Sequence, residues 1–312
     1  MTAWRKNGYN DRKVSVETDE IFISDGAKCD IANILDVFDI SDVLIPSPVY
    51  PVYADVNLMK GNRINFLELN EECGFIPCPE TVDKKAYIIY ICSPNNPTGI
   101  GYSASILKCW VDFALETGSV IVFDGAYSEY ITGDEPHSVY EIYGAKECSI
   151  EVCSLSKRAG FTGVRCGWSV VPKAIRVGGE SLNALWQRRQ STKFNGVGYP
   201  VQVAACAALS EKGRFECKKQ IKYYLDNAKL ITKLCENKGI TYFGGVSSPY
   251  VWMKCPNGYR SWKFFDYLLE RAGIVATPGV GFGKGGEGYM RLTGFNTQEK
   301  TAEAVQRLYD IL

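Results

Sequence analysis

The stretch SLSKRAGFTGVRCGW, residues 154–168, joins two short apolar runs through a segment that carries hydroxyl and cationic side chains. The run before it is CSIEVCSL, and the run after it is CGWSVV. Charges on a solvated helix face recur every three or four residues. Here Lys157 and Arg165 are eight residues apart, with mostly small or apolar residues between them. We therefore interpret the two runs as strands and the stretch between them as a bend that brings polar groups together.

Strand-like and helical patterns alternate along the first half of the chain. The strand-like runs are EIFIS, DVLIP, KKAYIIYIC and GSVIVFD, and helical spacing of apolar residues falls at 28–38 and 105–116. Such an order is typical of a mostly parallel sheet with helices on both faces. Beyond residue 199, one long helical pattern runs towards Lys238, followed by PYVWMKC, a helical pattern and GEGYMRLTGF. We predict an α/β protein with a large domain at 1–200 and a smaller C-terminal α/β domain at 201–312.

The composition excludes several classes of function. The 35 lysines and arginines balance 35 aspartates and glutamates, so no net charge favours nucleic acid or an anionic membrane. No apolar run reaches the roughly 18 residues of a membrane span. Twelve scattered cysteines without a C-x-x-C pair favour reduced thiols, and hence a cytoplasmic protein. His137 is the single histidine, in a polar loop, so we expect neither a histidine metal site nor a Ser-His pair.

Polar residues follow four of the predicted strands directly. In open parallel sheets, ligands bind beyond the carboxyl ends of the strands, so these four segments are expected to meet. Each segment alone has an ordinary interpretation: an Asn-Pro-Thr-Gly turn, an aspartate that caps a helix, or a core tyrosine. Four of them in succession indicate one site. The segments are residues 25–28 (DGAK), 93–99 (SPNNPTG), 124–127 (DGAY) and 154–157 (SLSK).

One end of this predicted site is suited to a phosphate. A helix that opens at residue 27 presents free backbone N–H groups and the positive end of its dipole. Hydroxyl and guanidinium groups add further donors. The residues expected to bind the phosphate are Ala27, Lys28, Ser154, Ser156 and Arg165.

The other end is suited to a flat, reactive ring. Lys157, if desolvated, has a lowered pKa and can form an imine with an aldehyde. Asp124, deep at a strand end, needs a cationic partner such as a protonated ring nitrogen. Tyr127 and Asn96 can hydrogen-bond a ring oxygen, and Tyr50 of the run PVYPVY can stack on the ring face.

Two other motifs point elsewhere and are rejected. Residues 281–286 (GFGKGG) match the glycine pattern of dinucleotide-binding folds, but they precede a strand-like run instead of a helix, so we expect a flexible loop. Residues 154–157 also match the S-x-x-K pattern of penicillin-binding enzymes. The chain has no S-D-N or K-T-G partner, and we expect Ser154 to end a strand instead of opening a helix.

The motifs resemble a known family. SPNNPTG, VFDGAYSEY and SLSKRAGFTGVRCGW, in this order, are similar to segments of class I and II pyridoxal-phosphate aminotransferases of fold type I. SDGAKCDI, SPVYPVY, WQRRQSTKFNGVGYPVQ and TPGVGFGKGGEGYMRLTGF resemble a narrower family, the LL-diaminopimelate aminotransferases of lysine biosynthesis. The resemblance runs from about residue 21 to the C-terminus. It implies the PLP-transferase fold, pyridoxal 5'-phosphate (PLP) as cofactor, amino-acid and keto-acid substrates, and a homodimer.

The resemblance also implies roles for single residues. Lys157, Asp124 and Tyr127 match the catalytic positions: the imine-forming lysine, the partner of the ring nitrogen and a donor to the ring oxygen. The positions that match cofactor contacts are Ala27, Lys28, Tyr50, Asn96, Asp124, Tyr127, Ser154, Ser156, Lys157 and Arg165. The positions that match substrate contacts are Lys28, Tyr50, Asn96, Asn195 and Arg291, with Arg291 on the α-carboxylate.

We therefore expect amino-group transfer between LL-diaminopimelate, or its cyclic precursor tetrahydrodipicolinate, and 2-oxoglutarate or glutamate. One departure qualifies this expectation. Members of the family carry a longer segment before the part that matches Ile21, and that segment helps to close the site. Two alternatives therefore stay open: a related aminotransferase that acts on aspartate or an aromatic amino acid, and a truncated PLP-binding fold without catalysis.

Overall fold

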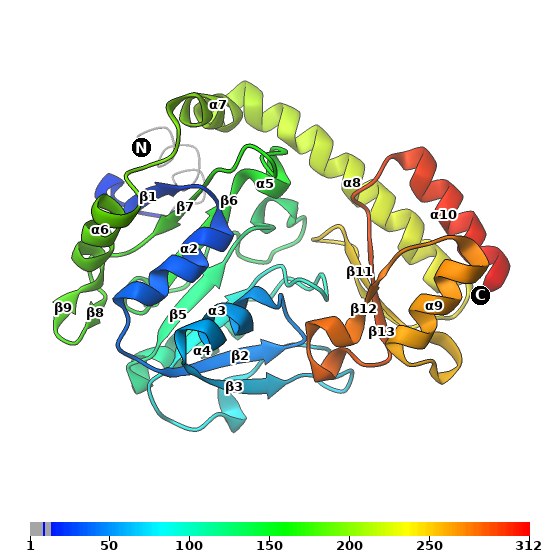
Figure 1. Cartoon of the computed structure of the whole chain (residues 1–312), viewed down its shortest axis with the longest axis horizontal. Coiled ribbons are helices and arrows are strands. Elements are labelled where there is room, and N and C mark those ends of the chain that lie inside the picture. The colour runs from blue at the N-terminus through cyan, green and yellow to red at the C-terminus, as the bar shows by residue number, and fades with distance from the viewer. Residues whose placement is uncertain (1–8, 10–13) are drawn as a thin grey trace.

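A seven-stranded sheet forms the centre of the computed structural model, which describes residue 9 and residues 14–312 (Figure 1). The strand order is β1-β7-β6-β5-β4-β2-β3. Strands β2 to β6 pair in parallel, which confirms the predicted sheet, but β7 is antiparallel to both of its neighbours. The strands are β1 (Ile21–Ser24), β2 (Asp42–Ser47), β3 (Arg63–Glu68), β4 (Ile88–Cys92), β5 (Val120–Asp124), β6 (Ser149–Ser154) and β7 (Gly167–Val170).

The antiparallel β7 follows from the length of its connection. Only the bend at residues 155–166 separates it from β6, and that bend contains the four-residue helix α5 (Leu155–Arg158). These 12 residues are at the lower limit for a parallel return, which usually needs a helix that crosses a face of the sheet, and the four-residue α5 is too short to do so. The chain therefore turns back beside β6, which keeps the bend at the carboxyl end of that strand.

Helices cover both faces of this sheet, so successive residues of the central strands enter different cores. Ile89 and Ile121 pack with helix α4 (Ala104–Thr117), through residues such as Trp110. Tyr90 and Val122 pack on the opposite face. The helices of that second face are α2 (Ala27–Asn33), α3 (Val52–Lys60) and α6 (Leu182–Lys193). Burial on both faces explains the unbroken apolar runs in the sequence.

Strand β3 and helix α3 were not predicted. β3 is an edge strand, and its residues are only half-buried or exposed, so RINFLE lacks the apolar run of a central strand. Helix α3 begins after Pro51 and ends at Gly61, whose positive φ of 82° closes it. Its first two residues, Val52 and Tyr53, belong to the run PVYPVY, whose two prolines obscure the start of a helix in the sequence.

A second, four-stranded antiparallel sheet lies in the C-terminal part of the chain, in the order β10-β11-β13-β12. Its strands are β10 (Tyr242–Gly244), β11 (Tyr250–Lys254), β12 (Thr277–Pro278) and β13 (Tyr289–Thr293). Helices α9 (Ser261–Ala272) and α10 (Gln298–Ile311) accompany this sheet (Figure 1). A short hairpin, β8 (Arg176–Val177) with β9 (Glu180–Ser181), precedes α6.

The long helical pattern of the sequence is two helices, α7 (Tyr199–Leu209) and α8 (Glu211–Asn237). Ser210 separates them, because its hydroxyl accepts from Gly213 N at 3.1 Å and caps α8. With 27 residues, α8 is about 40 Å long and runs from the large sheet to the small one (Figure 1). Leu209 of α7 still packs in the core of the large sheet, and the division at residue 200 stays a prediction.

The glycine-rich segment at 281–286 is folded. It forms the 3-10 helices η9 (Gly279–Phe282) and η10 (Lys284–Gly286), so the segment is not the flexible loop that we expected. A Cβ on Gly285 would lie 2.5 Å from the carbonyl oxygen of Leu69, which shows how closely the segment packs. It leads into β13, as the sequence indicated.

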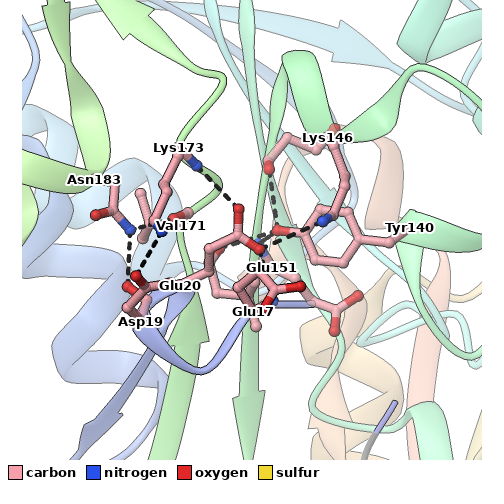
Figure 2. Close-up of polar contacts among 11 residues, drawn as sticks. Glu17, Asp19, Glu20, Tyr140, Lys146, Glu151, Val171, Lys173 and Asn183 are labelled. Atoms are coloured by element: carbon pink, nitrogen blue, oxygen red, sulfur yellow. Dashed lines mark hydrogen bonds and ion pairs between the residues drawn. The ribbon is translucent and has the colours of Figure 1, made fainter. Parts of the chain in front are cut away.

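Polar contacts fix the chain just before β1, in the 3-10 helix η2 (Thr18–Glu20) (Figure 2). The carboxylate of Glu20 accepts from Lys173 N at 3.1 Å and from Lys146 Nζ at 3.4 Å. Asn183 donates to the carbonyl oxygens of Asp19 and Val171 at 3.2 and 2.7 Å. These contacts anchor the edge strand that leads to helix α2. Over the described residues, no helix combines the length and apolar character needed to cross a membrane.

Candidate active site

A pocket of about 340 Å³ opens where the four predicted segments meet. Every predicted site residue except Asn195 lines it, so the expected convergence of the strand ends is confirmed. The lining residues that we predicted are Ala27, Lys28, Tyr50, Asn96, Asp124, Tyr127, Ser154, Ser156, Lys157, Arg165 and Arg291. Further lining residues, which the sequence did not reveal, are Ile31, Tyr53, Cys92, Ala126, Thr162 and Tyr250.

Hydrogen-bond donors gather at the end of the pocket formed by α2 and α5. Helix α2 begins at Ala27, after Gly26 with φ 121°. A Cβ at Gly26 would lie 2.5 Å from Arg165 Nη2, so this glycine lets the guanidinium approach the helix N-terminus. Arg165 Nη1 donates to Ser156 Oγ at 3.3 Å, and Ser156 N donates to Ser154 Oγ at 3.0 Å. This donor set suits an anion such as phosphate.

Ser154 both ends a strand and opens a helix. It is the last residue of β6 and the N-cap of α5, so our expectation that it would not open a helix is wrong. The strand runs into the helix without a loop, which the sequence pattern does not reveal. The chain still lacks the S-D-N and K-T-G motifs of penicillin-binding enzymes, so it does not match them.

Lys157 lies among other cations. Burial lowers the pKa of its ammonium, and the positive charges of Arg291, Arg165 and Lys28 lower it further. Its Nζ lies 5.3 Å from the centre of the Phe295 ring. A lysine in such surroundings releases its proton more readily than one in water, and its neutral amine is the form that attacks an aldehyde.

Asp124 is a buried carboxyl group with two donors and no ion pair among the described residues. Tyr53 donates its hydroxyl proton to Oδ2 at 2.7 Å, and Ala126 N donates to Oδ1 at 3.0 Å. Only 5% of the residue is exposed, and this burial raises the pKa of the carboxyl group. A carboxylate in this position is best stabilised by a cation that enters the pocket.

Arg291 connects the small sheet to the segment after β4. It extends from β13, and its Nη1 donates to Asn96 Oδ1 at 2.6 Å while Nη2 donates to Thr277 Oγ1 at 3.3 Å. Its guanidinium carbon lies 4.5 Å from the Tyr250 ring centre and 4.8 Å from that of Phe282. Held in this way, the guanidinium presents a fixed fork to a carboxylate.

The two sheets meet next to the pocket through glycines. A Cβ on Gly99, the last residue of SPNNPTG, would lie 2.5 Å from the carbonyl oxygen of Tyr250 and 3.0 Å from the Cα of Gly244. A Cβ on Gly244 would lie 2.4 Å from the carbonyl oxygen of Thr98. Both glycines have positive φ, 71° and 75°. This glycine seam, Gly99 with Gly244, brings the backbone of the segment after β4 into direct contact with the backbone of the small sheet.

Asn195 lies outside the pocket. It has a positive φ of 66° and lines a separate hollow beside edge strand β1 and helix α6, with Phe22 and Gln190 among its neighbours. Within this chain, therefore, the side chain is not brought to the other predicted residues. Its contact with a substrate stays a prediction.

Comparison with known proteins places the chain in a family. The model of the family "Aminotransferase class I and II" matches residues 2–308. LL-diaminopimelate aminotransferase of Lawsonia intracellularis is 49% identical over 98% of this chain and 78% of its own length. The protein of the same name from Agathobacter rectalis is 47% identical over 97% of this chain and 78% of its own. L,L-diaminopimelate aminotransferase from Chlamydomonas reinhardtii has the same fold, with a TM-score of 0.93, 40% identity, and coverage of 99% and 79%.

The pocket fits the cofactor of that family. PLP carries a phosphate, an aldehyde and a ring nitrogen, and each finds a matching group: the donors around Arg165, the amine of Lys157 and the carboxyl group of Asp124, which has no ion pair among the described residues. The fold-type-I architecture predicted from the motifs is confirmed by the structural match. The chain belongs to the class I and II aminotransferase family, whose members are PLP-dependent transaminases.

Proposed function

We propose that this protein transfers an amino group between LL-diaminopimelate, or its cyclic precursor tetrahydrodipicolinate, and 2-oxoglutarate or glutamate, with PLP as cofactor. The observation that carries the proposal is the pocket itself. It places a lysine of lowered pKa between anion donors, a buried carboxyl group and an arginine clamp. The substrate is suggested by the relatives with 49% and 47% identity that bear this activity in their names.

Different residues of the pocket bind different parts of PLP. Ala27, Ser154, Ser156 and Arg165 hold the phosphate group, and Asp124 holds a proton on the ring nitrogen. When bound, PLP supplies an aldehyde and an electron-withdrawing ring, which makes the α-proton of an attached amino acid removable. The hydroxyl of Tyr53 fixes the orientation of the Asp124 carboxyl group at 2.7 Å.

Lys157 moves the proton in this scheme. Its lowered pKa supplies a neutral amine. With PLP bound, this amine would take the proton from Cα of the substrate and would deliver it to the carbon of the cofactor's aldehyde group. Arg291 orients the substrate by holding its α-carboxylate, and Tyr127 donates to the ring oxygen. After the keto acid leaves, a second keto acid reacts in the reverse order, which gives ping-pong kinetics.

A homodimer is part of the proposal. Leu58 and Met59 at the end of α3 are 72% and 80% exposed. Met59 lines a hollow that also includes Lys28 of the pocket, Phe194 and charged residues such as Asp55, so a surface of mixed apolar and charged side chains continues outward from the site. A second copy would bury it. Sedimentation equilibrium of the purified chain tests this point, and a monomer at micromolar concentration would contradict it.

A cytoplasmic location is also proposed. All twelve cysteines of the chain are described, and none forms a disulfide. Free thiols in this number suit a reducing compartment. Fractionation of cells that express the untagged chain tests the location, and recovery outside the cytoplasm would contradict it.

The activity is tested by mixing the purified chain with PLP and measuring both its visible absorption and glutamate formation from 2-oxoglutarate. LL-diaminopimelate is the donor, with aspartate and phenylalanine in parallel. Lys157→Ala removes the reactive amine, and Lys222→Ala is the matched control, because Lys222 is 74% exposed on α8.

We expect a visible band of bound cofactor in the wild type and in Lys222→Ala, and glutamate formation with LL-diaminopimelate. Lys157→Ala should lose glutamate formation, and its band should differ from that of the wild type because the lysine can no longer form an imine with the aldehyde. Turnover with aspartate or phenylalanine alone would support a related aminotransferase of different specificity. A band without turnover on any donor would support the non-catalytic PLP-binding fold, and the absence of a band would refute the proposed function.

A further inference from the structure

Tyr250 occupies a central place in the pocket. It opens β11 of the small sheet, is 5% exposed, and lines the pocket, yet it belongs to none of the motifs that led to the site. Its hydroxyl lies 2.6 Å from that of Tyr127, and its ring lies 4.5 Å from the guanidinium carbon of Arg291. The same residue thus contacts both the tyrosine beside the cofactor and the arginine expected to hold the substrate.

From this geometry we infer that Tyr250 is a positioning residue that couples cofactor binding to substrate binding, with its hydroxyl acting on Tyr127 and its ring acting on Arg291. The inference rests on the proposed function. The two contacts use different atoms of one side chain, so they can be removed separately.

Binding of the cofactor would decide which of the two hydroxyls donates the hydrogen bond. A phenol has a single proton, and burial raises the pKa of both tyrosines, so both keep it. If Tyr127 donates its proton to the ring oxygen of the cofactor, Tyr250 must donate the proton shared between the two hydroxyls. A phenol that accepts a hydrogen bond is a stronger donor. Tyr250 therefore strengthens the hold of Tyr127 on a negatively charged ring oxygen.

The ring contact fixes the arginine. Phe282 lies against the same guanidinium, 4.8 Å from it, and Arg291 Nε is buried without a partner. The aromatic faces therefore restrict the guanidinium where hydrogen bonds do not. The backbone of Tyr250 is fixed as well, because its carbonyl oxygen contacts the glycine seam and accepts from Gly245 N at 2.8 Å.

The test compares Tyr250→Phe, which removes only the hydroxyl, with Tyr250→Leu, which also removes the ring. Tyr242→Phe is the matched control: it lies in the same sheet and loses a hydroxyl bond of 2.7 Å to Glu236, but has no contact with the pocket. Three quantities are measured on the PLP-loaded protein. They are the pH midpoint of its visible absorption, the dissociation constant of the unreactive dicarboxylate glutarate, and kcat and KM for LL-diaminopimelate.

For Tyr250→Phe we expect the absorption midpoint to rise by about half a pH unit, because a weaker hydrogen bond stabilises the negative oxygen less. Its KM and glutarate affinity should stay within about twofold of the wild type, while kcat falls. Tyr250→Leu should show the same rise, and should also raise KM and the glutarate dissociation constant by about 5- to 30-fold, the range of a buried cation–π contact.

A Tyr250→Phe midpoint equal to that of Tyr242→Phe would overturn the hydroxyl contact. Equal KM values for Tyr250→Phe and Tyr250→Leu would overturn the ring contact. If Tyr250→Leu does not fold, Tyr250→Phe alone still decides the first contact, and Tyr250→Met, which has no ring but fills more of the space, replaces Leu for the second. Loss of the band or of turnover in the wild type would instead refute the proposed function, which keeps the two failures distinct.

Discussion

Asp124 and Glu151 are buried carboxyl groups on neighbouring strands, and their surroundings differ. Glu151 on β6 is in register with Phe123 on β5, so it points to the face of the sheet opposite to that of Asp124. There its oxygens accept from the hydroxyls of Tyr9 and Ser138, at 2.7 and 2.6 Å, and from Val139 N at 3.0 Å.

Figure 2 draws the polar cluster around Glu20 and Glu151, in which side-chain and backbone groups of the protein donate hydrogen bonds to both carboxylates. Asp124 has two donors and faces a pocket lined by four cationic side chains, Lys28, Lys157, Arg165 and Arg291. The comparison teaches that burial alone does not mark a functional carboxyl group. What marks Asp124 is burial together with a cavity and an excess of positive charge.

The comparison is tested most strongly by Asp124→Asn. The amide keeps the size of the side chain but cannot hold a proton on the ring nitrogen, so kcat should fall roughly 10²–10⁴-fold. Because burial raises the pKa of Asp124, its charge destabilises the cofactor-free fold as pH rises, and the variant should be at least as stable as the wild type at neutral pH. Steady-state kinetics and urea unfolding measure the two effects. A kcat within tenfold of the wild type would refute the role.

Glu151→Leu should show the reverse pattern: a loss of stability with little change in kcat. It leaves the hydroxyls of Tyr9 and Ser138 and the N–H of Val139 without their acceptor, which should lower the free energy of unfolding by about 3–5 kcal/mol. Glu151→Gln keeps one acceptor oxygen and should cost less. Turnover per folded molecule should stay within a few-fold of the wild type, and urea unfolding followed by active-site titration checks this. A specific loss of kcat would contradict the division between the two carboxyl groups.

Asp30 on α2 sharpens the comparison. It is a buried carboxyl group that has neither the set of donors found around Glu151 nor the cationic pocket found around Asp124. It is 1% exposed, and neither oxygen makes a hydrogen bond of normal geometry. Burial raises its pKa to about 7, although the nearby hydroxyls of Ser24 and Ser169 act in the opposite direction. Its proton therefore stabilises the fold fully below the pKa of the unfolded chain, near 3.9, and this contribution is lost as pH rises towards 7.

Between pH 5 and pH 8, the free energy of unfolding of the wild type should fall relative to that of Asp30→Asn by about 2–3 kcal/mol. Unfolding of the cofactor-free proteins in urea at both pH values measures the difference. Parallel pH profiles of the two proteins would show that Asp30 does not titrate in this range.

The smallest effect on stability is expected at the solvent-exposed edge of the polar cluster around Glu20 and Glu151. Lys173 Nζ lies 2.5 Å from Asp19 Oδ2, but the two side chains are 53% and 63% exposed. Solvent screens such a pair, so Lys173→Ala should leave the thermal midpoint unchanged within error. A clear decrease would mean that the outer pair supports the bond from the backbone N–H of Lys173 to Glu20, which the substitution leaves in place.

Much of the site was predictable because it depends on strand order. Once the runs before Asp124 and Ser154 are taken as parallel strands, their carboxyl ends must lie side by side, and Tyr127 and Lys157 follow within three residues. Tyr53 and Tyr250 could not be found in this way. Tyr53 reaches Asp124 only because α3 begins at Val52, and Tyr250 approaches from the other sheet, whose position the sequence pattern does not encode.

Asn195 shows where prediction from sequence similarity fails. Its segment, WQRRQSTKFNGVGYPVQ, contributed to the resemblance, but within one chain the residue lines a different hollow. Similarity of sequence transfers a residue's identity, whereas its spatial neighbours depend on the fold and on the assembly. The direction of β7 was missed for a different reason: the bend before it contains only a four-residue helix, which the composition of the bend does not reveal.

The glycine seam has a consequence for how such a pocket can diversify. Because Gly99 and Gly244 meet backbone to backbone, the spacing between the cofactor-binding wall and the carboxylate-binding wall is set by atoms that every residue shares. Side chains around the pocket can be exchanged for others without changing that spacing. New substrate preferences can therefore arise by substitutions that leave the distance between the two walls unchanged. A single methyl group at the seam, by contrast, would change that distance for every substrate.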